Sequence, residues 1–192
     1  MEARATKHQK IMTVDEYLAF EECSDVRHEF VGGELHAFAG TTVRHNRIAG
    51  NIYRVLAESG DRAGCDVFMS DVKLHVPGDI FYYPDVMVVC DKNDTDPRIK
   101  SLPCVVVEVL SDDTRVTDLR EKLMFYRQVD CLDTYLIVEQ HERKVYRHWR
   151  DDERLWWSDT VVRDRTIPIP SLDTELTLDD VYRNLPEPRG DE

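Results

Sequence analysis

The sequence predicts an α/β (α+β) fold in which a central mixed β-sheet is flanked by helices. Segments with the 3.6-residue period of a helix alternate with segments of period two, in the order helix, strands, helix, strand. Of the 192 residues, 42% are hydrophobic and 33% are charged, with only 8 glycines and 8 prolines. This length and composition are typical of one globular domain and exclude a disordered, collagen-like or fibrous chain.

A helix and a hairpin are expected near the N-terminus. Thr13 and Glu16 have the spacing of a capping box, which predicts a helix over residues 14–22. Residues 28–38 form two short alternating runs around Gly32-Gly33, a pattern that predicts a β-hairpin. The polar residues 1–11 are expected to form a flexible leader.

A longer helix and most of the strands follow the hairpin. Thr41 or Thr42 is expected to cap a helix that extends to about Ser59, because apolar residues recur there at helical spacing. That apolar stripe consists of Ile48, Ile52, Val55 and Leu56. Beyond it the period changes to two, and strands are expected at 65–76, 82–90, 104–110, 134–139, 144–149, 154–158 and 161–169.

The run at 104–110, CVVVEVL, is nearly all apolar, as in a strand that is covered on both faces. A polar loop is expected at 91–101, a helix from Thr117 or Asp118 to about Gln128, and a short acidic helix near 178–182. The whole is expected to form one domain over residues 12–185, with extra C-terminal strands and an acidic tail at 186–192.

The charge balance limits the classes of partner. The chain has 25 Lys and Arg against 38 Asp and Glu, a formal net charge of −13 at pH 7. Such a surface repels phosphate backbones at long range, which argues against a non-specific nucleic-acid coat protein without excluding one local basic groove.

The compartment is expected to be the cytoplasm, with no membrane contact. No apolar run approaches the length of about 20 residues that a membrane-spanning helix needs, and the N-terminus lacks the apolar segment of a signal peptide. The five cysteines are an odd number without a CxxC pair, and we expect reduced, buried thiols rather than a disulfide scaffold or a zinc site.

Glu108 is the first candidate for chemistry, because it is a lone carboxylate in the apolar run 104–110. An ionised carboxylate buried without partners is very costly, so Glu108 must be paired, protonated or bound to a cation. The more ordinary of these alternatives is a buried ion pair with a Lys or Arg of a neighbouring helix.

Asp85 and Lys122 are two further candidates. Asp85 follows Pro84 at the start of a predicted strand, where a Pro-Asp pair often has only a turn or strand-start role. Lys122 flanks the expected inward stripe Leu119, Leu123 and Tyr126, and its ordinary role would be a surface pair with Asp118.

Taken together, these three residues predict a magnesium site. Two carboxylates on neighbouring strands supply hard oxygen ligands, and Mg²⁺ prefers such sparse sites, completed by water and phosphate oxygens. The cation lowers the pKa of a bound water, while the lysine orients that water or takes its proton.

The order of these motifs resembles a nuclease family. The strings YYPDVMVVCDK and LPCVVVEVLSDDTRVTDLREKLMFYRQVDCLDTYLIVE, with RHEFVGGELHAFAGTTVRHNRIAGNIYRVL upstream, are similar to the Uma-type family of putative restriction endonucleases in the PD-(D/E)XK nuclease superfamily. The resemblance covers most of residues 12–140. It implies a restriction-endonuclease-like core and Mg²⁺-dependent hydrolysis of DNA phosphodiester bonds, with Mn²⁺ as a possible substitute.

The resemblance also implies roles for single residues. Asp85 matches the Pro-Asp aspartate and Glu108 the second acid, whereas the expected lysine two positions later is replaced by Leu110. The resembled family supplies this lysine from the following helix, where Lys122 matches it. The Val109 carbonyl is a natural further metal ligand.

The superfamily has one more acidic residue upstream of these motifs. Two glutamates of the hairpin are candidates for it, and we favour Glu34 over Glu29.

Other side chains are weaker candidates. His45 could touch the site or a phosphate, although a hydrogen-bonded core histidine is more common. Arginines on a helix are mostly solvated, and tryptophans on C-terminal strands mostly pack in a core or an interface. This group comprises Arg115, Arg120, Trp149, Trp156 and Trp157, while Ser111 and Thr114 are expected to serve their loop.

Three functions remain open from the sequence. The first is the metal-dependent endonuclease, which acts as a dimer if both DNA strands are cut. The second is a catalytically inactive interaction or assembly module, in which Glu108 and Lys122 form a buried ion pair. The third is a hydrolase of nucleotides or small phosphoesters that uses the same site.

Overall fold

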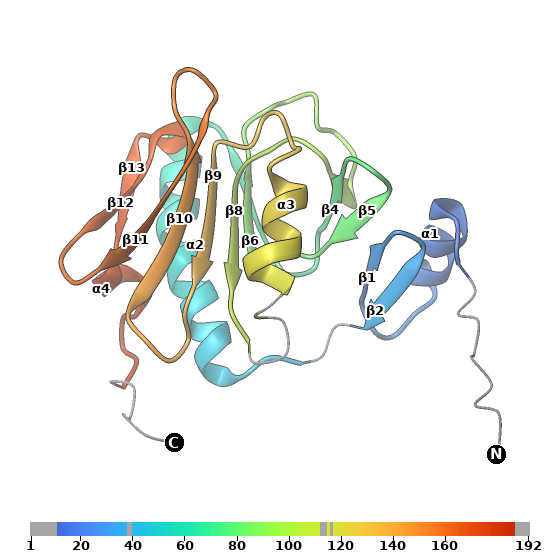
Figure 1. Cartoon of the computed structure of the whole chain (residues 1–192), viewed down its shortest axis with the longest axis horizontal. Helices are drawn as coiled ribbons and strands as arrows, with labels where there is room; N and C mark the ends of the chain where they lie inside the picture. Colours follow the sequence, from blue (N-terminus) through green and yellow to red (C-terminus); the bar gives the residue numbers. More distant parts are fainter. Residues whose placement is uncertain (1–10, 38–39, 112–114, 116, 187–192) are drawn as a thin grey trace, which may run out of the picture.

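The computed structural model describes residues 11–37, 40–111, 115 and 117–186 (Figure 1). The predicted leader and acidic tail lie outside this part, except for Ile11 and Pro186, as does Phe38 at the end of the expected hairpin. The fold is mixed α+β, as predicted, with a six-stranded sheet between helices at its centre.

The helical segments are few. They are α1 (Val14–Glu22), α2 (Val43–Ala63), a π-helix η1 (Thr117–Lys122) that continues into α3 (Leu123–Tyr126), a 3₁₀-helix η2 (Pro170–Leu172) and α4 (Leu178–Val181). The described residues contain no helix with the length and apolar character needed to cross a bilayer.

The strands are β1 (His28–Val31), β2 (Glu34–Ala37), β3 (Asp66–Met69), β4 (Lys73–Val76), β5 (Ile80–Tyr82), β6 (Val86–Val89), β7 (Ile99–Lys100), β8 (Pro103–Val109), β9 (Thr134–Val138), β10 (Lys144–Arg150), β11 (Trp156–Val162), β12 (Thr166–Ile169) and β13 (Thr174–Thr177). The six-stranded sheet has the order β11-β10-β9-β8-β6-β3, and a five-stranded sheet has the order β2-β1-β5-β4-β7. In the central sheet only the β8–β9 pair is parallel.

Strand β8 is covered on both faces, as its apolar sequence predicts. Val105 and Val107 pack toward α2, together with Ile48, Ile52 and Leu56, which are three of the four residues of the predicted stripe. Val106 on the other face packs with Tyr126 of α3, so α2 and α3 lie on opposite sides of the sheet (Figure 1). Period-two alternation therefore places Glu108 on the α3 side, next to Val106.

Two expected long strands are each divided between the two sheets. Residues 65–76 form β3 and β4, separated at Ser70, whose positive φ of 47° turns the chain. Residues 82–90 are divided at Pro84, which has no N–H to continue a ladder. This division moves Asp85 to the very start of β6.

Helix starts agree with the capping signals, whereas α2 ends later than the expected Ser59. Thr13 and Glu16 form the expected capping box of α1, and Thr42 caps α2. Helix α2 continues past Gly60 to end at Gly64, which has a left-handed φ of 70°. A Cβ on Gly60 would lie 2.8 Å from Val67 Cγ2, so this glycine allows the helix to approach β3 closely.

The C-terminal strands differ from the prediction in their limits. The run 161–169 is interrupted after Val162, and its second half forms β12, which pairs with an unpredicted strand, β13. A short strand, β7, lies in the expected polar loop, where it pairs with β4.

The expectation of five reduced thiols is wrong for two of the cysteines. Cys65 and Cys90 form a disulfide, whereas Cys23, Cys104 and Cys131 are free. The register of β3 against β6 pairs Asp66 with Val89, so the cysteines one step further along lie directly opposite each other. Because disulfides are rare in cytosolic proteins, the cysteines no longer support the predicted cytoplasmic location.

His148 on β10 makes stability depend on pH. Its Nδ1 is 2.6 Å from Ser158 Oγ, and burial together with the charge of Arg127 lowers the pKa of the imidazole from 6.5 to about 4. The unfolded chain takes up this proton near pH 6.5, whereas the folded chain takes it up only near pH 4. Stability therefore falls as the pH drops from 6.5 toward 4. Since the ring is only partly buried, the wild type should lose about 1–2 kcal/mol more than His148→Gln over this range.

Urea unfolding of both proteins at pH 7 and pH 4.5 measures this difference. An equal loss of stability in the two proteins would show that His148 is not the group that titrates.

Candidate active site

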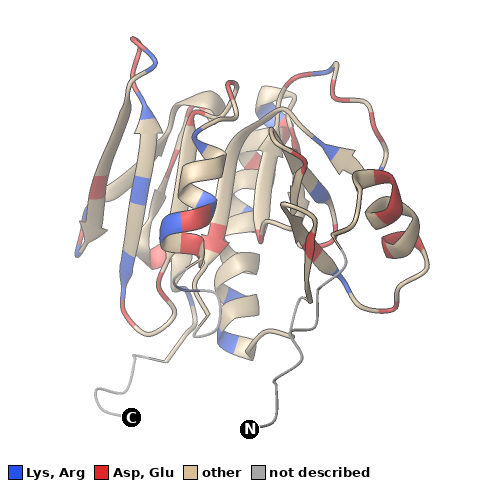
Figure 2. Cartoon of the chain, turned by 45° about the vertical axis from the view of Figure 1, so that its right-hand side comes forward, with Lys and Arg blue, Asp and Glu red and all other residues tan. Residues whose placement is uncertain are grey.

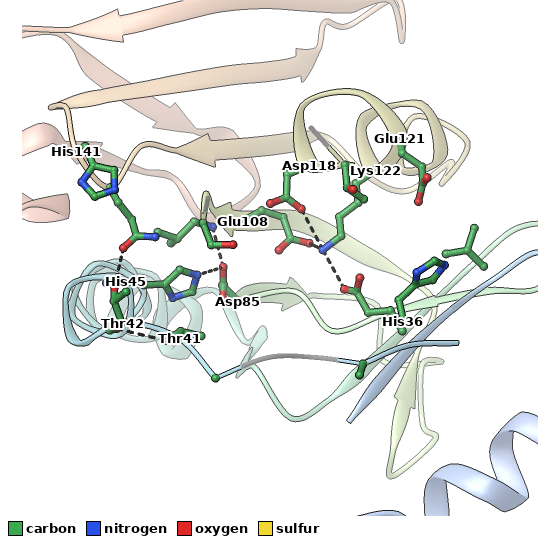
Figure 3. A pocket seen from close by; sticks show the side chains of 18 residues that line it. His36, Thr41, Thr42, His45, Asp85, Glu108, Asp118, Glu121, Lys122 and His141 are labelled. Carbon is green, nitrogen blue, oxygen red and sulfur yellow. Dashed lines mark hydrogen bonds and ion pairs between the residues drawn. The ribbon is translucent and has the colours of Figure 1, made fainter. Parts of the chain in front are cut away.

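A pocket of about 410 Å³ lies where β8 ends and β6 begins, between the start of α2, the η1 helix and the β1–β2 hairpin. The side chains around it come from segments far apart in the sequence (Figure 3). Asp85, Glu108, Val109 and Lys122 all line it. The convergence that the sequence predicts for these residues is therefore observed.

Strand register brings the two predicted carboxylates together. β6 and β8 are antiparallel, with Val86 opposite Val107. One step further along this register, Asp85 lies opposite Glu108. Asp85 Oδ2 accepts the backbone N–H of Val109 at 2.7 Å and lies 3.2 Å from His45 Nε2.

Glu108 faces the helix that follows β8 in sequence. Its Oε1 accepts hydrogen bonds from Lys122 Nζ at 3.1 Å and from the Tyr126 hydroxyl at 2.7 Å. Both donors lie on one face of the η1–α3 segment, which covers this side of the sheet. The buried ion pair considered for Glu108 is thus present.

Lys122 contacts three carboxylates, not one. Besides Glu108, its Nζ lies 2.9 Å from Glu29 Oε1 and 3.2 Å from Asp118 Oδ1. The Tyr82 ring is 5.1 Å from the ammonium. The four charged residues are all buried, with Glu29 the most exposed at 9%, so this cluster is part of the interior and not a surface ion pair.

The orientation of the η1–α3 segment differs from the expected one. Asp118, Lys122 and Tyr126 are its buried face, whereas Leu119 and Leu123 are only partly buried beside it. The segment begins as a π-helix rather than an α-helix, a geometry that is frequent at functional sites. The polar residues, not the leucines, therefore face the sheet.

The pocket carries an excess of negative charge. Burial raises the pKa of Glu108 well above its ordinary value. The charge of Lys122 lowers this pKa, but the neighbouring Asp118, Asp85 and Glu29 raise it again. Burial alone would lower the pKa of Lys122, but Glu108, Glu29 and Asp118 outweigh it, so the ammonium stays protonated. The pocket lining thus contains one ammonium, that of Lys122, and five acidic residues: Glu29, Asp85, Glu108, Asp118 and Glu121.

The upstream acid in the pocket is Glu29 and not the favoured Glu34. Glu34 is exposed on β2, at the edge of its sheet, and does not line the pocket. Glu29 lies on β1, which pairs with both β2 and β5 and is therefore an inner strand. The alternation of the hairpin cannot distinguish the two glutamates, because it does not reveal which strand is at the edge.

Two site residues were missed or underrated in the sequence. The sequence suggests that Asp118 is a surface partner of Lys122, whereas Asp118 is only 1% exposed. Gln140 follows β9, accepts the Thr42 hydroxyl at 2.7 Å and lines the pocket. A signal for Gln140 existed, because polar residues after two adjacent parallel strands meet at one edge of the sheet.

Some of the weaker candidates line the pocket and others do not. His45 and Ser111 line the pocket, whereas Trp149, Trp156 and Trp157 do not. Arg115 forms a bidentate pair with Glu139, both distances being 2.7 Å, and Arg120 is exposed. Thr114 lies outside the described residues.

The row of basic residues along β10 is already engaged in contacts within the chain. Basic residues recur along β10 at Lys144, Arg147 and Arg150, as Figure 2 shows. Lys144 pairs with Glu142 and Arg147 with Asp159, while Arg150 donates to backbone carbonyls.

Comparison with known proteins decides the family. Residues 14–180 match the family Uma2, described as "Putative restriction endonuclease". The uncharacterised protein sll1609 of Synechocystis sp. is 34% identical over 152 residues, which cover 77% of this chain and 85% of that protein. The chain belongs to the Uma2 family.

A second relative, the uncharacterised protein slr1290 of Synechocystis sp., is 27% identical over 176 residues, which cover 91% of this chain and 93% of that protein. Among solved structures, a "putative nuclease belonging to DUF820" from Anabaena variabilis superposes with a TM-score of 0.74 at 18% identity. The alignment covers 89% of the Uma2 chain described here and 97% of the Anabaena chain. This likeness confirms the nuclease-like fold.

Proposed function

We propose that this Uma2 protein is an Mg²⁺-dependent endonuclease that hydrolyses DNA phosphodiester bonds. The observation that carries the proposal is that Asp85, Glu108 and Lys122, from three separate elements, line one open pocket. Paired carboxylates with an adjacent ammonium have the chemistry needed to activate water next to a phosphate.

The donor atoms of the pocket fit a hard divalent cation. Hydrogen bonds engage one oxygen of each carboxylate, Oδ2 of Asp85 and Oε1 of Glu108. The other oxygens, Oδ1 and Oε2, would hold the cation. Because the N–H and C=O of a strand residue point to the same side, the Val109 carbonyl faces Asp85 and would be a third ligand.

The pocket offers few protein ligands, which suits Mg²⁺. Within the described residues, no three His, Cys, Asp or Glu side chains form a group that could hold a metal by themselves. Mg²⁺ usually binds one or two carboxylates and keeps several waters or takes phosphate oxygens, so a pair of carboxylates with a carbonyl is sufficient.

Each residue has a distinct role in the proposed reaction. When bound, the cation supplies the positive charge that lowers the pKa of the attacking water and balances charge on the phosphoryl oxygens. Lys122 donates from its ammonium to the water or to a non-bridging phosphate oxygen. Tyr126 fixes Glu108 through its 2.7 Å hydrogen bond, and Glu29 and Asp118 keep Lys122 charged and in place.

The proposal is tested with supercoiled plasmid, and with single-stranded DNA and RNA in parallel, in Mg²⁺ or Mn²⁺ against EDTA. We expect metal-dependent cleavage of DNA that falls about 10- to 100-fold in Glu29→Gln and is unchanged in Glu34→Gln. Activity that persists in EDTA, or that is lost in Glu34→Gln only, contradicts this assignment. Conversion to nicked circles without linear product would indicate a chain that acts alone and not as the proposed homodimer.

A second candidate function rests on the three contacts of Lys122. An ammonium that forms ion pairs with Glu29, Glu108 and Asp118 stabilises the cluster without a metal, which favours a catalytically inactive interaction or assembly module. The module binds no Mn²⁺ at millimolar concentration and cleaves none of the three substrates, so the same experiment distinguishes the two functions.

A further inference from the structure

His45 lies against Asp85 in a position that the cap of α2 determines. It is the third residue of the helix, and its backbone N–H donates to Thr42 Oγ1 at 3.0 Å. Thr42 in turn donates to Gln140 Oε1 at 2.7 Å. Two successive contacts therefore fix the first turn of α2, and with it the imidazole, which is only 5% exposed.

The contact with Asp85 determines which ring nitrogen carries the proton. Nε2 lies 3.2 Å from Asp85 Oδ2, and an ionised carboxylate only accepts hydrogen bonds, so Nε2–H is the donor. Nδ1 is then buried without a hydrogen-bond partner. A buried nitrogen without a hydrogen-bond partner lowers the stability of the fold. This cost is consistent with a role for His45 in its contact with Asp85.

Both donors to Asp85 bind the same oxygen. His45 Nε2 and the Val109 N–H approach Oδ2 from α2 and from β8, two rigid elements on different sides of the carboxylate. A carboxylate held at one oxygen by two donors loses its rotational freedom. Its other oxygen, Oδ1, then has one fixed direction.

We propose that His45 is a positioning residue, which together with the Val109 N–H holds Oδ2 of Asp85 so that Oδ1 is presented to the divalent cation. This inference rests on the proposed metal-dependent function and assigns to His45 a role through Asp85, without contact with the cation. Residues that orient metal ligands in this way usually contribute 10- to 100-fold to metal affinity.

Three substitutions test the proposal. His45→Gln keeps an N–H donor at the distance of Nε2, whereas His45→Asn is polar but too short to reach Asp85, and His45→Leu has no donor. The dissociation constant of Mn²⁺ is measured by calorimetry for each variant, and thermal unfolding in EDTA is measured in parallel. We expect His45→Leu and His45→Asn to bind Mn²⁺ about 10- to 100-fold more weakly, and His45→Gln to stay within about threefold of the wild type.

The outcomes separate this inference from the function on which it rests. If the wild type binds Mn²⁺ and His45→Leu and His45→Asn bind it equally well, His45 has no positioning role. If His45→Gln binds as weakly as the other variants and all three unfold at lower temperature, the role of His45 is structural only. If the wild type binds no Mn²⁺, the proposed function itself fails, and this inference with it.

Discussion

Replacement of Lys122 by methionine should lower the free energy of unfolding by about 3–5 kcal/mol at pH 7. Methionine keeps the length and most of the apolar contacts of the side chain but removes the ammonium that faces Glu29, Glu108 and Asp118. The three carboxylates are then left buried without a cation, which is far more costly than the loss of an exposed ion pair. Urea unfolding in EDTA measures the change.

Two further variants test whether the loss of stability comes from the buried carboxylates. Lys92→Met removes an exposed lysine that lies 3.7 Å from Asp66, and should change stability by less than about 0.5 kcal/mol. Adding Glu108→Gln to Lys122→Met removes one of the uncompensated charges and should restore part of the lost stability. A Lys122→Met protein as stable as the wild type would contradict the buried cluster.

Replacement of Asp85 by asparagine should reduce the rate of DNA cleavage by about 100- to 1,000-fold. Metal ions supply several kcal/mol of charge stabilisation in the transition state, and each 1.36 kcal/mol is a factor of ten in rate. Asparagine has the shape of aspartate, so Val109 N–H keeps an acceptor, but the negative charge that attracts the cation is gone.

The matched control is Asp66→Asn, an exposed aspartate on the neighbouring strand β3. Cleavage of supercoiled plasmid is followed for both variants over a range of Mg²⁺ concentrations. A cleavage rate in Asp85→Asn equal to that of Asp66→Asn would mean that Asp85 does not bind the metal, and that the observed activity comes from another site or a contaminant.

Local signals in the sequence predicted much of the fold. The capping box at Thr13, the hairpin at Gly32-Gly33 and the apolar stripe of α2 each depend on residues a few positions apart, and the structure confirms all three. The predictions that failed concern pairing between distant segments. Neither the divided strands nor the Cys65–Cys90 disulfide follows from composition, because both depend on the register of β3 against β6.

The same distinction applies to the site. Asp85, Glu108 and Lys122 could be found because a charged residue in or beside an apolar run is unusual wherever it lies. Glu29 and Glu34 have similar local surroundings, and only the position of β1 inside its sheet separates them. The role of Asp118 depends on the rotation of η1, which packing against the sheet determines and which the positions of the leucines do not reveal.

The most direct test of the account is the position of Mn²⁺ in crystals of the wild type soaked with MnCl₂. We expect one anomalous peak in the pocket, about 2.1 Å from Oδ1 of Asp85 and from an oxygen of Glu108. A pocket without a peak under these conditions, with Lys122 still ion-paired with Glu29, Glu108 and Asp118, would contradict the proposed metal site.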